Sequence, residues 1–285
     1  MSEYPVRTDL ALEAREKVQE KQPDLRGVRV EEEFLKDTEI QVTKVIVESK
    51  NGAKELGKPM GTYITLEAPN MTEPDDDYHR EISKELAKQM KELLPRDNNM
   101  SVLVVGLGNR EVTPDALGPN VINNMMITRH LIKEFGKAAY EEEKANLISG
   151  IVPGVMAQTG METAEILRGV IKETKPDLVI AVDALAARST KRLNRTIQIT
   201  NTGIHPGSGV GNYRNAITEE SLGVPVIAIG IPTVVDAATI VNDAMENMLS
   251  AQATLNNMFV TPKDVDENVK RLGYTISEAL NIALS

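Results

Sequence analysis

Two aspartates stand where a pair of carboxylates could activate a water molecule. Asp183 ends the apolar run 178–182, and Asp115 lies between the apolar run 101–106 and the next helical segment. We expect both side chains at the carboxyl ends of parallel strands, where open α/β sheets keep their active sites. Close carboxylates cannot both ionise freely, so the pKa of one rises and the pair can divide acid and base roles. The structural alternative is that Asp115 caps the helix at Pro119 while Asp183 only binds backbone amides.

Two glycine-rich segments lack the patterns of familiar nucleotide and serine-hydrolase sites. The segment 106–109, Gly-Leu-Gly-Asn, follows an apolar run, but Glu111 occupies the third glycine position of a dinucleotide fingerprint. The segment 205–212 lacks the Gly-Lys-Ser/Thr ending of a phosphate loop, and Pro206 breaks the Gly-x-Ser-x-Gly nucleophile pattern. We therefore predict no cofactor. The glycines indicate sharp turns or close backbone approach, with ordinary solvated turns as the alternative.

Composition removes further classes of chemistry and of partner. The chain has no cysteine, and its three histidines, His79, His130 and His205, show no His-Glu-x-x-His spacing. Its 32 Lys and Arg against 42 Asp and Glu give a net charge of −10, which disfavours direct nucleic-acid binding. No run approaches the ~18 apolar residues of a membrane span, and the N-terminal residues lack a signal-peptide pattern. We expect a cytoplasmic protein without a membrane partner.

The elements that must position the aspartates alternate between strands and helices. Residues 8–22 are charged and helix-prone, and we interpret them and the acidic run 31–33 after them as a mobile N-terminal arm. The β-like runs 38–49 and 61–67 predict a hairpin. Apolar residues at helical spacing from Ile82 to Leu93 predict a helix that Pro95 ends.

Beyond that helix, uninterrupted Val, Leu and Ile runs are separated by helical patterns. We predict strands at 101–106, 145–152, 177–183 and 224–231, with 195–201 as an additional strand. We predict helices at 120–135, at 159–172, from about Val235, and after Pro262. This order is typical of a single α/β domain over 1–285, with a mainly parallel sheet, helices on both faces, an N-terminal β-hairpin and C-terminal helices.

The segments around both aspartates resemble the spore germination proteases, the endopeptidases that degrade small acid-soluble spore proteins. The matching segments follow in order through nearly the whole chain: 7–11, 104–109, 113–119, 150–163, 182–188, 201–212 and 232–239. Long ordered motifs of this kind are highly specific. One departure is the link between Asn247 and Met258, which is much shorter than the insertion of better-known members.

The resemblance implies an atypical aspartic peptidase that is made as a zymogen and acts as a homotetramer in the spore core. It implies that Asp115 and Asp183 are catalytic and that small acid-soluble spore proteins are the substrates. The fold also resembles that of hydrogenase maturation peptidases, which share a Gly-x-Gly-Asn turn and bind a metal. The short link leaves open any contribution of the missing insertion to assembly or substrate access.

Two alternatives stay open beside this mechanism. In the first, Asp115, Asp183 and His205 bind a metal ion that activates water. In the second, the chain binds basic spore proteins without cutting them. Residues 8–13, Thr-Asp-Leu-Ala-Leu-Glu, resemble the acidic-then-apolar sites that the family cuts in spore proteins and in its own prosegment. We therefore predict self-cleavage between Asp9 and Leu10, with residues 1–9 as the prosegment.

Overall fold

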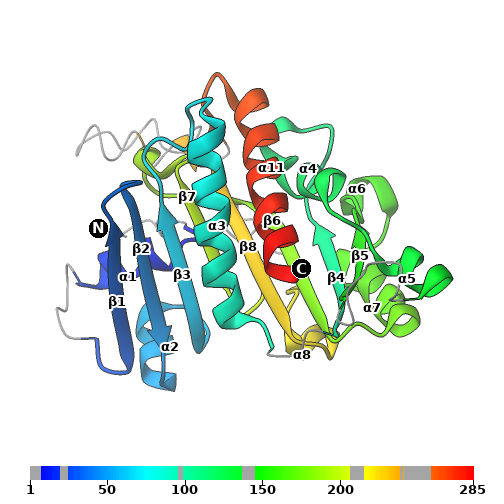
Figure 1. Ribbon diagram of the computed structural model, residues 1–285. Helices are drawn as coiled ribbons and strands as arrows, with labels where there is room; N and C mark the ends of the chain where they lie inside the picture. Colours follow the sequence, from blue (N-terminus) through cyan, green and yellow to red (C-terminus); the bar gives the residue numbers. More distant parts are fainter. Residues whose placement is uncertain are drawn as a thin grey trace.

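A single mixed sheet forms the centre of the computed structural model, which describes residues 8–19, 25–95, 99–136, 145–205, 215–237, 240 and 258–285 (Figure 1). The strand order is β1-β2-β3-β7-β8-β6-β4-β5, and β9 pairs with β8. The strands are β1 (Val28–Leu35), β2 (Ile40–Val47), β3 (Gly61–Glu67), β4 (Ser101–Gly106), β5 (Leu147–Ile151), β6 (Leu178–Ala187), β7 (Thr196–Thr200), β8 (Val226–Asp236) and β9 (Phe259–Val260).

Parallel and antiparallel pairing divide the sheet into two halves. One half consists of the parallel strands β5, β4, β6 and β8. Each of them is a nearly continuous apolar run, as expected where helices bury both faces of a sheet. β1, β2, β3 and β7 pair antiparallel, and β7 joins the parallel half through an antiparallel contact with β8. The predicted α/β class and N-terminal hairpin are confirmed, while parallel pairing is confined to one half.

Helices cover both faces of the sheet. On one face, α3 (Asp76–Leu93), α4 (Leu117–Asn124) and α11 (Val265–Leu284) pack on the main core, with α3 and α11 side by side across the front of Figure 1. On the other face, α7 (Thr163–Thr174) and α8 (Glu219–Leu222) cover the parallel half, and two N-terminal helices cover the hairpin half. In the part of the chain that the structure describes, no helix is long and apolar enough to cross a membrane.

The predicted long helices form where apolar spacing and capping agree. In α3, Ile82, Leu86 and Met90 recur every fourth residue and are fully buried. Asp75 caps this helix, because its carboxylate accepts the backbone N–H groups of Asp77 and Tyr78. The apolar stripe of α11 packs against the same core, which confirms the prediction of a helix after Pro262.

The predicted mobile N-terminal arm is wrong. Residues 11–19 form a docked helix, α1 (Ala11–Gln19), and Leu10 and Ala11 are fully buried. The acidic run 31–33 belongs to the edge strand β1, whose Glu31 lies opposite Lys44 of β2. Charged side chains are typical of an exposed sheet edge, so they did not argue against a strand.

Other predicted boundaries also differ. The loop between β2 and β3 contains a short helix, α2 (Lys50–Leu56). The helix predicted at 120–135 is two helices, α4 and α5 (Arg129–Phe135), because the chain is extended at Met125. The helix predicted at 159–172 is α6 (Met156–Thr159) and then α7, because Gly160 adopts a left-handed conformation with φ 70°.

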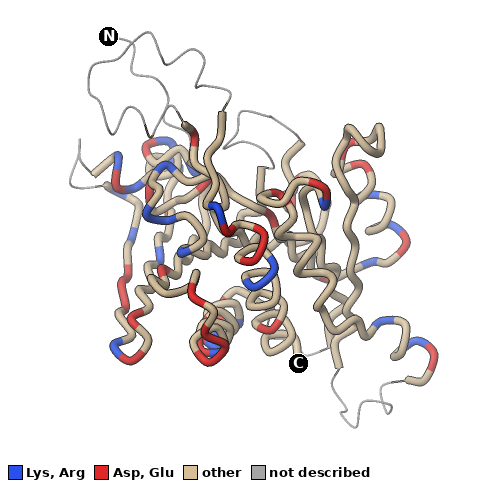
Figure 2. The backbone as a smooth tube through the Cα atoms, turned by 90° about the horizontal axis from the view of Figure 1, so that it is seen from above, with Lys and Arg blue, Asp and Glu red and all other residues tan. Residues whose placement is uncertain are grey.

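Two predictions fall near or on undescribed residues. β8 continues to Asp236, so no helix begins at Val235, and most of the helix predicted there lies outside the described residues. The same holds for most of the glycine-rich segment 205–212 and of the link between Asn247 and Met258. Acidic and basic residues are interspersed along the described chain (Figure 2).

Candidate active site

Asp183 lies inside β6, with its carboxylate almost fully buried. Its side chain is 6% exposed, and Oδ1 accepts the backbone N–H of Ala184 at 2.9 Å. The prediction that Asp183 ends the strand is wrong, since β6 continues to Ala187. This continuation pairs with β8 after a register shift at Leu185 and Ala186. Such irregularities re-aim side chains, and they are frequent next to active sites.

Asp115 ends a 3-10 turn, η1 (Thr113–Asp115), that precedes α4. Its Oδ2 accepts the backbone N–H of Asn109 at 2.7 Å. The predicted alternative in which Asp115 caps the following helix is wrong, because the cap position belongs to Ala116 and has no side-chain hydrogen bond. Thr233 of β8 secures the turn from the other side, since its hydroxyl donates to the Pro114 carbonyl at 2.7 Å.

The turn 106–109 connects the two aspartates through the backbone. The N–H of Leu107 donates to the carbonyl of Val182, the residue before Asp183, at 2.8 Å, and two residues later Asn109 binds Asp115. Gly108 has φ +106°, and a Cβ there would lie 1.9 Å from the Asp115 carbonyl oxygen. Only glycine fits this approach. The predicted close backbone approach at these glycines is confirmed.

A cavity of about 370 Å³ opens at the aspartates. Asp115, Asp183 and His205 all line it, and so does Asp9 from the N-terminal segment. His205 is exposed, while Asp115 is only partly exposed. Within the described ranges, no three His, Asp or Glu side chains are grouped closely enough to hold a metal ion. The sequence-predicted site residues therefore share one cavity, and the metal-dependent alternative stays a prediction.

The N-terminal segment borders this cavity through Asp9, which bonds to Ala186 of β6. The N–H of Asp9 donates to the Ala186 carbonyl at 3.1 Å, and the N–H of Ala186 donates back to Asp9 Oδ2 at 2.9 Å. Leu10 is fully buried in an apolar cluster with Leu185 and Val235. Burial of a leucine side chain contributes roughly 2 kcal/mol, so docking of this segment is favourable.

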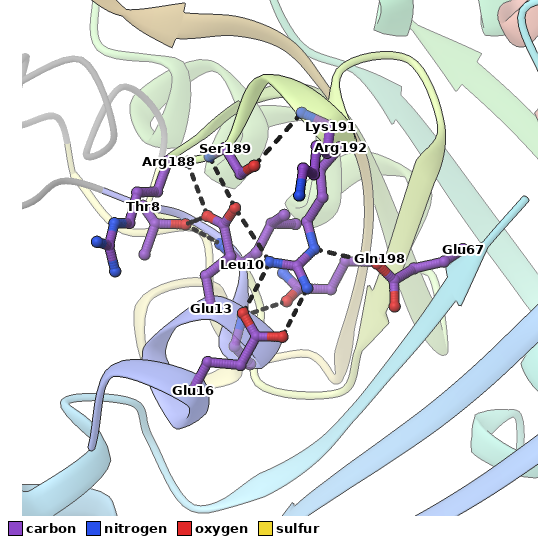
Figure 3. A network of polar contacts seen from close by, with 11 residues as sticks. Thr8, Leu10, Glu13, Glu16, Glu67, Arg188, Ser189, Lys191, Arg192 and Gln198 are labelled. Atoms are coloured by element: carbon purple, nitrogen blue, oxygen red, sulfur yellow. Dashed lines mark hydrogen bonds and ion pairs between the residues drawn. The ribbon is translucent and has the colours of Figure 1, made fainter. Parts of the chain in front are cut away.

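Glu13 anchors the same segment from its other end (Figure 3). Its carboxylate is 2% exposed and accepts the N–H groups of Arg188 at 2.8 Å and Ser189 at 3.0 Å, just beyond β6. The hydroxyl of Thr8 also donates to Glu13. These bonds tie α1 to the strand that carries Asp183.

Arg192 compensates the buried charge of Glu13. Its guanidinium lies 3.3 Å from Glu13, 2.7 Å from Glu16 and 3.1 Å from Glu67, as Figure 3 shows. Burial acts to lower the pKa of Arg192, but the hydrogen bond to Glu16 and the neighbouring carboxylates outweigh it and raise the pKa above its ordinary value. Arg192 therefore stays charged.

Sequence reasoning missed the polar residues that contact the segment, including Glu13, Lys58 and Gln198. The one available signal was the alternation of polar residues in β7, where Thr196, Gln198 and Thr200 are all buried. Period-two alternation places them on one face, which indicates a polar lining under that strand. Lys58 follows a short loop helix, and nothing in its sequence surroundings distinguished it.

This fold and site define an α/β protein in which two aspartates line one cavity at a sheet, an arrangement compatible with acid–base hydrolysis. Comparison with known proteins gives the family. A model described as germination protease matches residues 6–254, and the chain belongs to that family. Its role is that of a protease in spore germination.

Curated relatives match over nearly the full chain. Germination protease of Caldanaerobacter subterraneus subsp. tengcongensis is 46% identical over 98% of this chain and 94% of the relative. That of Clostridium tetani is 46% identical over 98% and 95%. Germination protease of Bacillus mycoides is 46% identical over 87% of this chain and 68% of its own length. Among solved structures, a NiFe hydrogenase maturation protease from Thermococcus kodakarensis KOD1 covers 67% of this chain and 98% of its own, at 18% identity and TM-score 0.35.

Proposed function

We propose that this protease starts the degradation of small acid-soluble spore proteins by an aspartic mechanism. The observation that supports it most is that Asp115 and Asp183 line one cavity and are joined through the turn 106–109. In this mechanism one carboxylate takes a proton from water while the other, protonated, gives a proton to the leaving nitrogen. The deprotonated partner is the base, and the protonated partner is the acid.

We also propose that the enzyme is a zymogen that cuts itself between Asp9 and Leu10. Support comes from the position of Asp9, which lines the cavity of the two aspartates and is hydrogen-bonded to Ala186 of β6. Asp9, the last residue of the proposed prosegment, would then occupy part of the site until it is released.

The test is incubation of the purified protein with a small acid-soluble spore protein, followed by mass spectrometry of the fragments. We expect a few defined cuts after acidic residues. Stable association without any fragment would favour the alternative of a binding protein. Asp183→Asn serves as the matched control, since it should bind the substrate and leave it intact.

Treatment with a chelator distinguishes the metal-dependent alternative from the aspartic mechanism. We expect prolonged treatment with a chelator to leave the rate of cleavage unchanged. Loss of activity with recovery on addition of one divalent ion would instead favour a site of Asp115, Asp183 and His205. His205→Ala provides a second check, because removal of a metal ligand costs far more than loss of a loop hydrogen bond.

The oligomeric state and the cellular location are proposed from the family resemblance. We propose a homotetramer that acts in the cytoplasm of the spore core. Light scattering of the purified full chain measures the assembly, and a mass of one or two chains would contradict the tetramer. Fractionation of germinating spores measures the location.

A further inference from the structure

Two side-chain donors converge on one backbone oxygen of the N-terminal segment. The Nζ of Lys58 donates to the carbonyl oxygen of Asp9 at 2.9 Å, and the Nε2 of Gln198 donates to the same oxygen at 3.3 Å. This carbonyl belongs to the Asp9–Leu10 peptide bond. It is the bond that the proposed function assigns to self-cleavage, and the role of the two donors rests on that proposed function.

Both donors are held in position by local structure. α2 ends at Gly57 in a left-handed conformation, and the N–H of Lys58 then binds the Ala53 carbonyl, which directs the chain back over the hairpin. Gln198 lies on β7, and its Oε1 accepts the N–H of Ala11 at 2.6 Å. Its amide therefore holds backbone groups on both sides of Leu10.

The sheet places these donors next to the catalytic strand. Asp183 lies opposite Gly230, and Gly230 lies opposite Gln198, so the three residues form one row across β6, β8 and β7. Residues opposite one another share a face, and two strand spacings amount to roughly 10 Å. Gly230 has no side chain, and the side chain of Leu185 packs over it instead, since a Cβ at Gly230 would lie 2.5 Å from Leu185 Cγ.

Asp9 lies between two cavities. On one side is the cavity of Asp115 and Asp183, and on the other is a smaller one of about 70 Å³ lined by Lys58 and Gln198. Carboxylates suited to activating water thus border the residue on one side, and hydrogen-bond donors border it on the other. Hydrolysis of a peptide bond needs both groups, one to activate the water and one to bind the carbonyl oxygen.

We propose that Lys58 and Gln198 form the oxyanion site of this protease. Water adds to the Asp9 carbonyl carbon and gives its proton to the aspartate pair, while the electron pair of the C=O bond moves onto the oxygen that Lys58 and Gln198 hold. When the C–N bond breaks, the pair returns a proton to the nitrogen of Leu10, leaving a carboxyl group and an amine. Donors preorganised toward the developing negative charge stabilise this transition state.

The charge of Lys58 suits this role. Burial lowers the pKa of its ammonium group, while the carboxylates of Asp9 and Glu13 oppose the shift. A desolvated cation stabilises a nearby anion more strongly than a solvated one does. Because both donors contact backbone and not side chains, the same site serves external substrates bound in the same register.

The rival interpretation is that Lys58 only fastens the N-terminal segment, and it predicts the opposite sign. Losing a fastener exposes the active site sooner, so cleavage of an added peptide would be as fast as in the parent or faster. Losing an oxyanion donor slows the reaction itself, by about 10²–10³-fold in kcat for one donor.

The experiment compares full-length Lys58→Met with the parent and with Lys54→Met, a matched control on the exposed side of α2. The self-cleavage rate is followed by mass. Each chain is then treated with immobilised parent enzyme to remove residues 1–9, and kcat and KM are measured for a peptide that repeats residues 5–14. We expect Lys58→Met to lose at least about 10²-fold in both rates, with the kcat of Lys54→Met unchanged.

A second variant keeps the proposal falsifiable if Lys58→Met does not fold. Gln198→Glu retains the acceptor for Ala11 and replaces the donor to Asp9 by an acceptor, and we expect its kcat to fall at least about 10-fold. A kcat equal to the parent's in either folded variant would overturn the oxyanion site and leave the protease function standing. If the parent itself cuts neither its own chain nor the peptide, the proposed function fails and the oxyanion site fails with it.

Discussion

The segment 8–13 borders two cavities of similar size, one at each end. The two cavities differ in the balance of acidic and basic side chains that line them. At one end, Asp9 joins Asp115 and Asp183 around a cavity of about 370 Å³ that is otherwise largely apolar. At the other end, Glu13 borders a cavity of about 370 Å³ together with Arg192 and other charged or polar residues. Three acidic and three basic side chains line the second cavity, whereas three aspartates and His205 line the first.

This difference suggests that the residues around Glu13 fix the structure and that the residues around Asp115 and Asp183 serve the reaction. A buried carboxylate with an arginine and two backbone amides is compensated, so it fixes structure. Asp9, Asp115 and Asp183 each accept one backbone N–H and line one cavity, where a carboxylate can also take part in chemistry. We therefore expect substitutions at the first cluster to change activity and substitutions at the second to change stability.

The largest expected effect is on catalysis. Asp115→Asn and Asp183→Asn should each reduce the cleavage rate by about 10²–10⁴-fold, because each removes one member of the proposed acid–base pair. The melting temperature should stay near that of the parent, because asparagine keeps the size of the side chain and an acceptor oxygen. Near-normal turnover in either variant would end the two-aspartate mechanism. Joint loss of fold and activity would show that these carboxylates are needed for stability, as we expect of Glu13.

The next effect is on stability at the second cluster. Glu13→Gln should lower the free energy of unfolding by about 3 kcal/mol, because it leaves Arg192 partly buried without its most enclosed partner. Glu16→Gln is the matched control: Glu16 is 47% exposed, and a pair of this kind contributes less than about 1 kcal/mol. Denaturant titration measures both. Equal losses in the two variants would contradict the contrast between the clusters.

The smallest effect concerns pH, and it must be separated from activity. His79 is buried between α3 and α11, with Nδ1 2.8 Å from the Thr275 hydroxyl and Nε2 3.1 Å from the Glu73 carbonyl. Burial lowers its pKa, helped by the charge of Arg271 and opposed by the Glu73 carbonyl. Its stabilising contribution is therefore present above its unfolded pKa of about 6.5 and is lost as pH falls below that value toward the folded pKa.

His79→Gln should remove this part of the acid destabilisation, at most about 1.4 kcal/mol per pH unit in that window. His130→Gln, at an exposed position on α5, should leave the pH profile as in the parent. Unfolding free energies between pH 7.5 and 5 measure both. Identical profiles for the parent and His79→Gln would show that acid destabilisation arises elsewhere.

Sequence alone predicted the elements whose apolar pattern is long and regular. The strands of the parallel half and helices α3 and α11 follow from buried runs or helical spacing. Strand β1 and the docking of the helix-prone segment that forms α1 were missed because both carry many charges. Their packing depends on partners far along the chain, such as Lys44 opposite Glu31 and the sheet face beneath Leu10.

The candidate site was predicted as far as its chemistry is local. Asp115, Asp183 and the glycine turn stand in recognisable surroundings at the ends of apolar runs. Lys58 and Gln198 do not stand in recognisable surroundings. They lie 140 positions apart in the sequence, and only the fold brings both to the carbonyl of Asp9. Glu13 and Arg192 were missed for the same reason.

The most direct test of the two-aspartate mechanism is the N-terminal mass of the full chain over time. The parent, Asp183→Asn, and a mixture of the two are incubated at pH about 5 and about 7.5, a range that spans the titration of raised carboxylates. We expect a new terminus at Leu10 in the parent, and in Asp183→Asn only when active enzyme is present, with faster cleavage at the lower pH. Asp183→Asn that cuts itself alone at the parent's rate would contradict this mechanism, and a parent chain that stays intact under every condition would contradict self-cleavage between Asp9 and Leu10.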